Sequence, residues 1–100
     1  MIDFSRIVGF DWDEGNARKS VERHGVTQPE AEQALADERI LVADDLSHSE
    51  TEARYQALGQ TLEGRYLHVS FTLRRDSTLI RVISARDMNR KERTHYEDQA

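Results

Sequence analysis

Strict alternation of apolar and polar residues marks the stretch from Arg65 to Leu73. A period of two is typical of a β-strand with one buried face. One face of this strand would carry Leu67, Val69, Phe71 and Leu73, and the other Tyr66, His68, Ser70 and Thr72. The pattern therefore predicts a half-buried strand whose polar face meets water or a ligand.

Apolar, β-rich runs elsewhere in the chain predict four more strands. They cover Ile7–Trp12, Arg39–Ala43, Arg54–Thr61 and Thr78–Ala85. Short turns join the alternating strand to the strands before and after it, and connections of that length favour an antiparallel meander. A helix is predicted between the first two runs, from Glu14 to His24, because Asp13 is a suitable N-cap and Gly25 a suitable residue beyond the end.

Two further helices have clear start signals. Thr27 and Glu30 form the sequence of a capping box, in which each side chain bonds the other residue's backbone N–H. Asn89 and Glu92 have the same spacing and predict the start of a final helix. The expected order is β-α-α-β-β-β-β-α. This order predicts an α+β fold in which helices pack on one face of a mainly antiparallel sheet.

Length and composition limit the class of protein. One hundred residues with 37% apolar content fit one domain, expected to span residues 1–100. The chain has no cysteine, which excludes disulfides, thiolate metal sites and a cysteine nucleophile. The sequence shows neither a signal peptide nor an apolar stretch of membrane-spanning length. We therefore expect a soluble cytoplasmic protein without a membrane partner.

Charge divides unevenly along the chain. The formal net charge of -5 combines a balance of -8 over Met1–Glu52 with +3 over Ala53–Ala100. Arg90, Lys91 and Arg93 lie in the first turn of the expected final helix, where the helix dipole disfavours cations by about 0.3–1 kcal/mol each. A helix selected for stability alone would reverse that order. The arrangement favours contact with an anion such as a nucleic-acid backbone.

Alternation also places several candidate ligands on the polar sheet face. If the strand register brings them together, Arg54, His68 and Arg81 line one exposed surface, and the final helix forms its rim. Guanidinium groups suit phosphate because their planar fork donates two parallel hydrogen bonds. The same residues are also compatible with an ordinary solvated face.

The histidines do not indicate a metal centre. His24, His48, His68 and His95 lie in four different elements without ligand-like spacing. We therefore expect no metal ion and no cofactor. His24 sits beside Gly25 at an expected helix end, a place where histidine commonly bonds a last-turn carbonyl.

Several sequence segments together resemble a known family. They are "FDWDEGN", "RHGV" followed by "EAEQAL", "HSETEARYQALGQTLEGRYLHVSFTL", "TLIRVISARDMNRKER" and "YE". In this order and spacing they are similar to the BrnT family, the toxin half of a bacterial type II toxin–antitoxin pair with a RelE-like fold. The chain departs from the family pattern at Asn16, where many members have lysine, and at Asp87, which interrupts the basic run.

The resemblance implies a ribonuclease that stops translation and is neutralised by a BrnA-type antitoxin. RNA would be the substrate, DNA would be bound only through the antitoxin, and a homodimer is expected within the toxin–antitoxin complex. The alternative is a weak or inactive member that serves as an antitoxin-binding module.

Metal-independent cleavage needs no nucleophile from the protein, because the RNA 2′-hydroxyl attacks the neighbouring phosphate. The protein must move two protons and stabilise charge on the phosphorane. The catalytic candidates are Arg54, Arg81, Arg86 and Arg93 for the phosphate, with Tyr96 or His24 for proton transfer. The RNA-binding candidates are His68, Arg90 and Lys91, and His68 is also the alternative titrating group.

Overall fold

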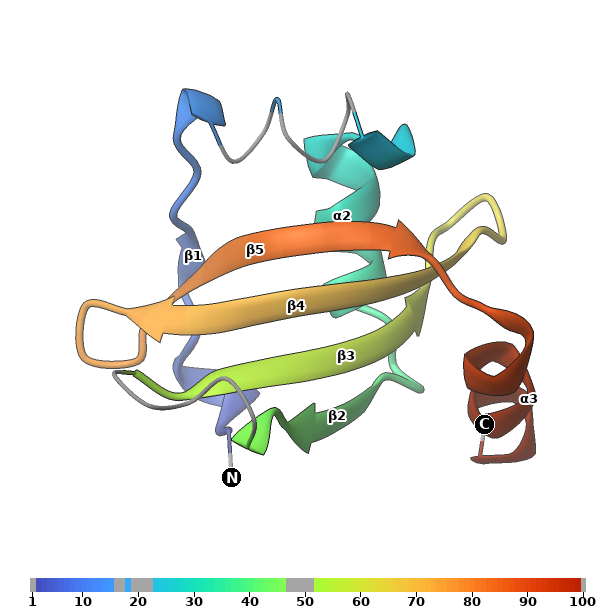
Figure 1. Cartoon of the computed structure of the whole chain (residues 1–100). Helices are drawn as coiled ribbons and strands as arrows, with labels where there is room; N and C mark the ends of the chain where they lie inside the picture. The colour runs from blue at the N-terminus through green and yellow to red at the C-terminus, as the bar shows by residue number, and fades with distance from the viewer. Residues whose placement is uncertain (1, 16–17, 19–22, 47–51, 100) are drawn as a thin grey trace.

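The structure is a computed structural model that describes residues 2–15, 18, 23–46 and 52–99. Its elements are the 3₁₀ helix η1 (Phe4–Arg6), strand β1 (Gly9–Phe10), helix α2 (Gln28–Leu35), strands β2 (Leu41–Asp44), β3 (Arg54–Gln60), β4 (Tyr66–Arg74) and β5 (Leu79–Asp87), and helix α3 (Arg90–Gln99). Figure 1 shows the sheet crossing the molecule, with α2 behind it and α3 beside one end. The α+β class predicted from the sequence is confirmed.

The five strands form a mixed sheet in the order β1-β5-β4-β3-β2. The meander from β2 to β5 is antiparallel, as predicted, whereas β1 pairs in parallel with the start of β5. The expected strand Ile7–Trp12 is shorter than predicted, although Val8 and Asp11 extend its ladder through bonds to the carbonyls of Thr78 and Ile80. The parallel pairing was not predicted, because its partner lies some 70 residues away in the sequence.

Helix α2 covers one face of the sheet, which we call the core face. The predicted capping box is present: Glu30 N–H donates to the Thr27 hydroxyl at 3.3 Å, and Thr27 N–H donates to the Glu30 carboxylate at 2.9 Å. Ala34 lies directly against Gly59 of β3, where an added Cβ would come within 2.1 Å of the Ala34 carbonyl oxygen. Glycine at this position therefore sets how closely the helix approaches the sheet.

Alternation on β4 correctly predicts its core face. Leu67, Val69 and Phe71 are fully buried there, and Phe71 stacks on Tyr55 with ring centroids 5.5 Å apart. The opposite face carries His68, Ser70 and Thr72 and is called the arginine face below, because arginines from both neighbouring strands share it. Contrary to the expectation of an exposed surface, His68 and Thr72 are 7% and 2% exposed.

A β-bulge interrupts the pairing of β4 with β5. Ser70 pairs with Ser84, but the next residue, Phe71, pairs with Val82, so Ile83 is an extra residue on β5. Side chains alternate between faces along a strand, and an extra residue reverses that alternation beyond it. On β5, the arginine face therefore carries odd-numbered residues such as Arg81 before Ile83 and even-numbered residues such as Arg86 after it.

Helix α3 lies beside the sheet end where β3 finishes and β4 begins (Figure 1). The prediction that the helices pack on one face is therefore wrong for α3. Its start was predicted correctly: Glu92 N–H donates to the Asn89 side chain at 2.8 Å, and Asn89 N–H donates to the Glu92 carboxylate at 3.0 Å. Tyr96 is its buried residue, and its ring meets Tyr66 edge-on at 5.8 Å.

The helix predicted from Glu14 to His24 is only partly described. Residues 14–15, 18 and 23–24 are helical, whereas Asn16 and the other residues between them lie outside the described ranges. Within those ranges, no helix has the length and apolar character needed to cross a bilayer.

Candidate functional site

Two rows of side chains cross the arginine face. In the first row, Thr72 on β4 pairs with Arg54 on β3 and with Arg81 on β5. In the second row, His68 pairs with Arg86 on β5. Directly paired residues project from the same side of a sheet. The structure therefore brings Arg54, Arg81, Arg86 and His68 onto one face, as the sequence-based hypothesis required.

Arg81 is held by two carboxylates from the segment after β1. Its Nη2 donates to Asp13, and its Nη1 lies 3.6 Å from Asp11 Oδ2. The hydrogen bond to Asp13 is the main cause that raises the pKa of Arg81 above its ordinary value. The Asp13 side chain is 51% exposed, against 23% for Arg81. Solvent therefore reaches this pair from the carboxylate side.

Arg86 forms a two-bonded pair with Glu92 at the start of α3. Nη1 and Nη2 donate to the two carboxylate oxygens at 2.8 and 2.9 Å. Glu92 also caps α3 through Asn89, so one carboxylate joins β5 to the helix. The Arg86 hydrogen bonds are the main cause that lowers the pKa of Glu92. This geometry gives Arg86 a structural task in addition to any role with a ligand.

His68 is buried beside Arg86 and Glu92. Its Nε2 lies 3.3 Å from Gln56 Oε1 and 3.9 Å from Glu92 Oε2. Its Nδ1 is buried and has no hydrogen-bond partner among the described residues. Burial, followed by the nearby charge of Arg86, lowers the pKa of His68 below its ordinary value. The imidazole is therefore neutral near pH 7 and retains a nitrogen that can accept a proton.

Helix α3 meets the arginine face through Glu92, and its cations are neighbours of this residue in the chain. Arg90 and Lys91 are exposed in its first turn, beside Glu92. Arg93 places its guanidinium carbon 4.2 Å from the centre of the Tyr66 ring, and its Nε is 3.5 Å from Glu97. The last helix borders the face, as expected, at Glu92, which contacts Arg86.

Tyr96 lies away from the arginine rows. Its hydroxyl donates to Asp37, which also accepts from the Gln60 N–H at 2.8 Å. Burial and the bond to Asp37 raise the pKa of Tyr96 to about 12. Tyr96 is 2% exposed, and its bond to Asp37 holds α3 against the segment that follows α2. Its position gives little support to the expected proton-transfer role.

His24 also lies apart from the two rows. Its carbonyl accepts from Arg65 Nη2 at 3.2 Å, and the Arg65 guanidinium forks onto Asp87 at 2.7 and 3.0 Å. Asp87 pairs with buried Leu67, so it belongs to the core face. The side chain of Arg65 also bonds Glu30 at 3.0 Å, and Arg65 therefore ties the start of α2 to the end of β5.

Sequence reasoning missed Arg65, Asp11 and Asp13. Their partners are more than 20 residues away in the chain, and no local pattern announces them. It also treated Asp87 as an interruption of a basic run, whereas the structure pairs this residue with Arg65. Within the described ranges, no three His, Asp or Glu side chains are grouped closely enough to hold a metal ion.

Comparison with protein families assigns the chain to a family. Residues 12–92 match the model of the family described as the ribonuclease toxin BrnT of type II toxin–antitoxin systems. The match covers most of the chain. The protein belongs to the BrnT family.

A solved BrnT structure supports the fold. The crystal structure of the Brucella abortus ribonuclease toxin BrnT at 1.1 Å resolution superposes with a TM-score of 0.62 and 21% sequence identity. The superposition covers 83% of this chain and 99% of that chain. No curated protein sequence matches the chain significantly.

The part of this BrnT chain that matches the family runs from Trp12 to Glu92. It includes both rows of the arginine face and the carboxylates Asp13 and Glu92. Arg93 and Tyr96 fall beyond its end. The family match therefore covers β2 to β5 and the start of α3, whereas β1, Asp11 and most of α3 lie outside it.

Proposed function

We propose that the arginine face of this BrnT-family ribonuclease binds the scissile phosphodiester of RNA and cleaves it without a metal ion. The RNA 2′-hydroxyl attacks the adjacent phosphorus, the P–O5′ bond breaks, and the proton leaving the 2′-hydroxyl is balanced by one delivered to the departing 5′-oxygen. Arg54 and Arg81, which flank Thr72, are suited to stabilise the phosphorane oxygens. One well-placed donor contributes roughly 3 kcal/mol in such sites.

The main support is the bulge at Ile83. Arg81 and Arg86 are five residues apart, an odd interval that would place them on opposite faces of a regular strand. The extra residue places both on the face that carries His68. Bulges occur preferentially beside active sites, where they re-aim a side chain.

The carboxylates give the two arginines different roles. Carboxylate and phosphate offer the same pair of acceptors to a guanidinium fork. At Arg81, a phosphate would compete with Asp13, which is half exposed and belongs to an irregular segment. At Arg86, it would compete with Glu92, which is 21% exposed and caps α3. We therefore assign the phosphate contact to Arg81 and the support of the site to Arg86.

Proton transfer is best supplied from His68. This histidine lies in the second row beside Arg86, and its lowered pKa keeps it neutral near pH 7. Tyr96 bonds Asp37, and His24 lies near the core-face residue Asp87, so neither adjoins the two rows. Arg90, Lys91 and Arg93 would contact flanking phosphates from the rim.

The biological setting follows from the family. We propose a RelE-like topology, a BrnA-type antitoxin as partner, contact with DNA through that antitoxin alone, and a homodimer within the complex. RNA in the cytoplasm is the proposed target. Blocked translation would then be the direct result of cleavage.

Cleavage in the presence of EDTA tests this proposal. The purified protein, freed of antitoxin, is incubated with total RNA and an excess of EDTA, which removes contaminating metal ions. The chemical ends of the RNA products are then analysed. The proposal expects fragments ending in 2′,3′-cyclic phosphate. Loss of cleavage in EDTA would contradict the metal-free reaction. Failure to cleave any RNA, with tight antitoxin binding retained, would favour the alternative of a binding module.

A further inference from the structure

Strand β2 forms an open edge of the sheet. It is the last strand in the order, and its outer side pairs with no other strand among the described residues. Asp45 N–H donates inward to the Arg54 carbonyl at 2.9 Å. Because antiparallel bonds alternate, the backbone groups of Val42 and Asp44 point outward. An exposed edge of this kind is a template for another strand.

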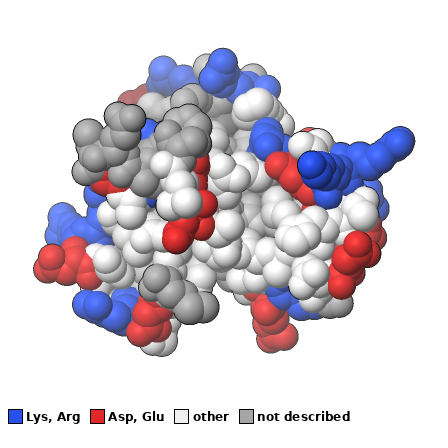
Figure 2. Space-filling view, turned by 60° about the horizontal axis from the view of Figure 1, so that its bottom comes forward, with Lys and Arg blue, Asp and Glu red and all other residues white. Residues whose placement is uncertain are grey.

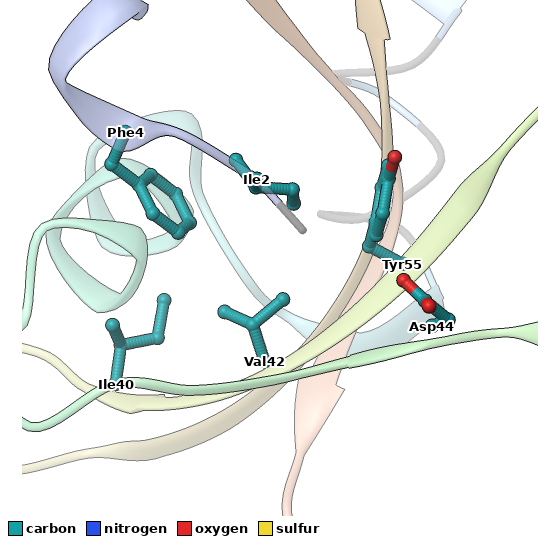
Figure 3. A pocket seen from close by; sticks show the side chains of 6 residues that line it. All are labelled: Ile2, Phe4, Ile40, Val42, Asp44 and Tyr55. Carbon is teal, nitrogen blue, oxygen red and sulfur yellow. The ribbon is translucent and has the colours of Figure 1, made fainter.

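An apolar groove lies beside this edge, on the core face. It has a volume of about 410 Å³ and is lined by Ile2, Phe4, Ile40, Val42, Asp44 and Tyr55. Figure 3 shows Ile2 and Phe4, from the N-terminal segment, on one side of the opening. Ile40 and Val42 lie on the other side. A second hollow of about 380 Å³ shares Phe4 and Ile40 and continues the groove toward the end of α2.

Charge indicates what this groove accepts. In Figure 2, where the bottom of Figure 1 comes forward, a broad hollowed surface is mostly uncharged, with acidic side chains within it. Among the described residues, the charged side chains that line the two hollows are those of Asp44 and Asp37, both acidic. A second copy of this chain would bring the same acidic residues and the same net charge of -5, so the two copies would repel each other. A basic and apolar segment avoids that repulsion.

We propose that an extended segment of the antitoxin, alternating apolar with other residues and carrying Lys or Arg, adds to β2 as a further strand. Its backbone bonds the outward groups of Val42 and Asp44, and alternate apolar side chains fill the groove beside Tyr55. Strand addition of this kind gains affinity from the backbone and specificity from pockets for alternate side chains. The inference rests on the proposed toxin–antitoxin function and locates the anchor away from the arginine face.

A pair of matched variants tests the location. Val42→Lys places a cation at the groove, whereas Leu62→Lys makes the same change at an apolar residue that is 88% exposed in the β3–β4 turn. The partner is the protein encoded by the neighbouring gene, titrated against each purified variant. We expect Kd to rise at least about tenfold for Val42→Lys and to stay within about twofold for Leu62→Lys. Equal Kd values for the two variants would overturn the inference.

Amide hydrogen exchange of the unmodified protein gives an answer that does not depend on a variant folding. The inference expects the Val42 and Asp44 amides to gain protection in the complex. Two results would overturn the inference. In the complex, protection could be confined to residues around Arg81. In the isolated protein, self-association could already protect the Val42 and Asp44 amides. The Val42→Lys variant should cleave RNA at the normal rate, because the change at β2 leaves the arginine face intact. This result separates the proposal of antitoxin binding at β2 from the proposal of RNA cleavage at the arginine face.

Discussion

Arg81 and Arg86 project from the same face of β5 although they are five residues apart. The extra residue at Ile83 produces this relationship by reversing the alternation between them. Each guanidinium is held by a carboxylate from outside the sheet, Asp13 for the first and Glu92 for the second. The face therefore presents cations in fixed positions, whose carboxylate partners a phosphate must displace or share.

Replacing Arg86 is expected to reduce stability as well as activity. Arg86→Ala removes both hydrogen bonds to Glu92 and leaves the capping carboxylate of α3 without its cation. We expect the free energy of unfolding to fall by about 1.5–3 kcal/mol, the range for hydrogen bonds to charged groups. Urea denaturation measures the change, with Lys91→Ala as a control on the exposed side of α3. Equal denaturation midpoints for the two variants would exclude the structural role.

Removing the carboxylate charge at Asp13 is expected to strengthen RNA binding. Asp13→Asn keeps the size of the side chain but weakens its hold on Arg81, so the guanidinium becomes available to phosphate. We expect a several-fold lower Kd for an RNA made uncleavable by 2′-O-methylation, measured by fluorescence anisotropy. If Asp13 instead positions Arg81 for catalysis, Kd will not fall and the cleavage rate will drop.

The buried His68 is expected to make stability depend on pH. Its folded-state pKa lies below the ordinary value of 6.5, so the unfolded chain binds the proton more readily. The stabilisation is complete above pH 6.5 and is lost as pH falls through the folded-state pKa. Urea denaturation at pH 7.5 and 5.5 should show a smaller change for His68→Gln than for the unmodified protein. Carboxylates with a lowered pKa, such as Glu92, change the free energy of unfolding mainly below about pH 4.5. Their effect can therefore be distinguished from that of His68.

Loss of the Tyr96 hydroxyl is expected to affect stability and not chemistry. Tyr96→Phe removes the donor to Asp37 and leaves a half-buried carboxylate with fewer bonds, a cost of about 1–2 kcal/mol. Its cleavage rate under single-turnover conditions should remain close to normal. A fall in that rate by tenfold or more at unchanged stability would return Tyr96 to the proton-transfer step.

Local patterns predicted much of the fold. Alternation identified the buried side of β4, and the capping boxes at Thr27 and Asn89 located the starts of α2 and α3. Such signals lie within four residues of one another and depend on short-range bonds. The parallel pairing of β1 with β5 and the placement of α3 beside the sheet depend on contacts between distant segments, which no local pattern reveals.

Some residues of the candidate site could be named from the sequence, but their contacts could not. Residue type and the polar face of β4 pointed to Arg54, His68 and Arg81. The bulge at Ile83 has no signature in an apolar run, so alternation alone could not bring Arg86 to the same face. The carboxylate partners of the arginines come from the irregular segment after β1 and from the first turn of α3.

The central claim is that Arg81 contacts the scissile phosphate, and single-turnover cleavage of RNA by Arg81→Ala tests it most directly. The matched control is Arg6→Ala, which removes the same charge from η1, where the guanidinium bonds the Asp76 carbonyl at 3.4 Å. We expect the rate constant to fall by about 10²-fold or more for Arg81→Ala and to change less than about twofold for Arg6→Ala. A folded Arg81→Ala protein that cleaves RNA at the unmodified rate would contradict the account.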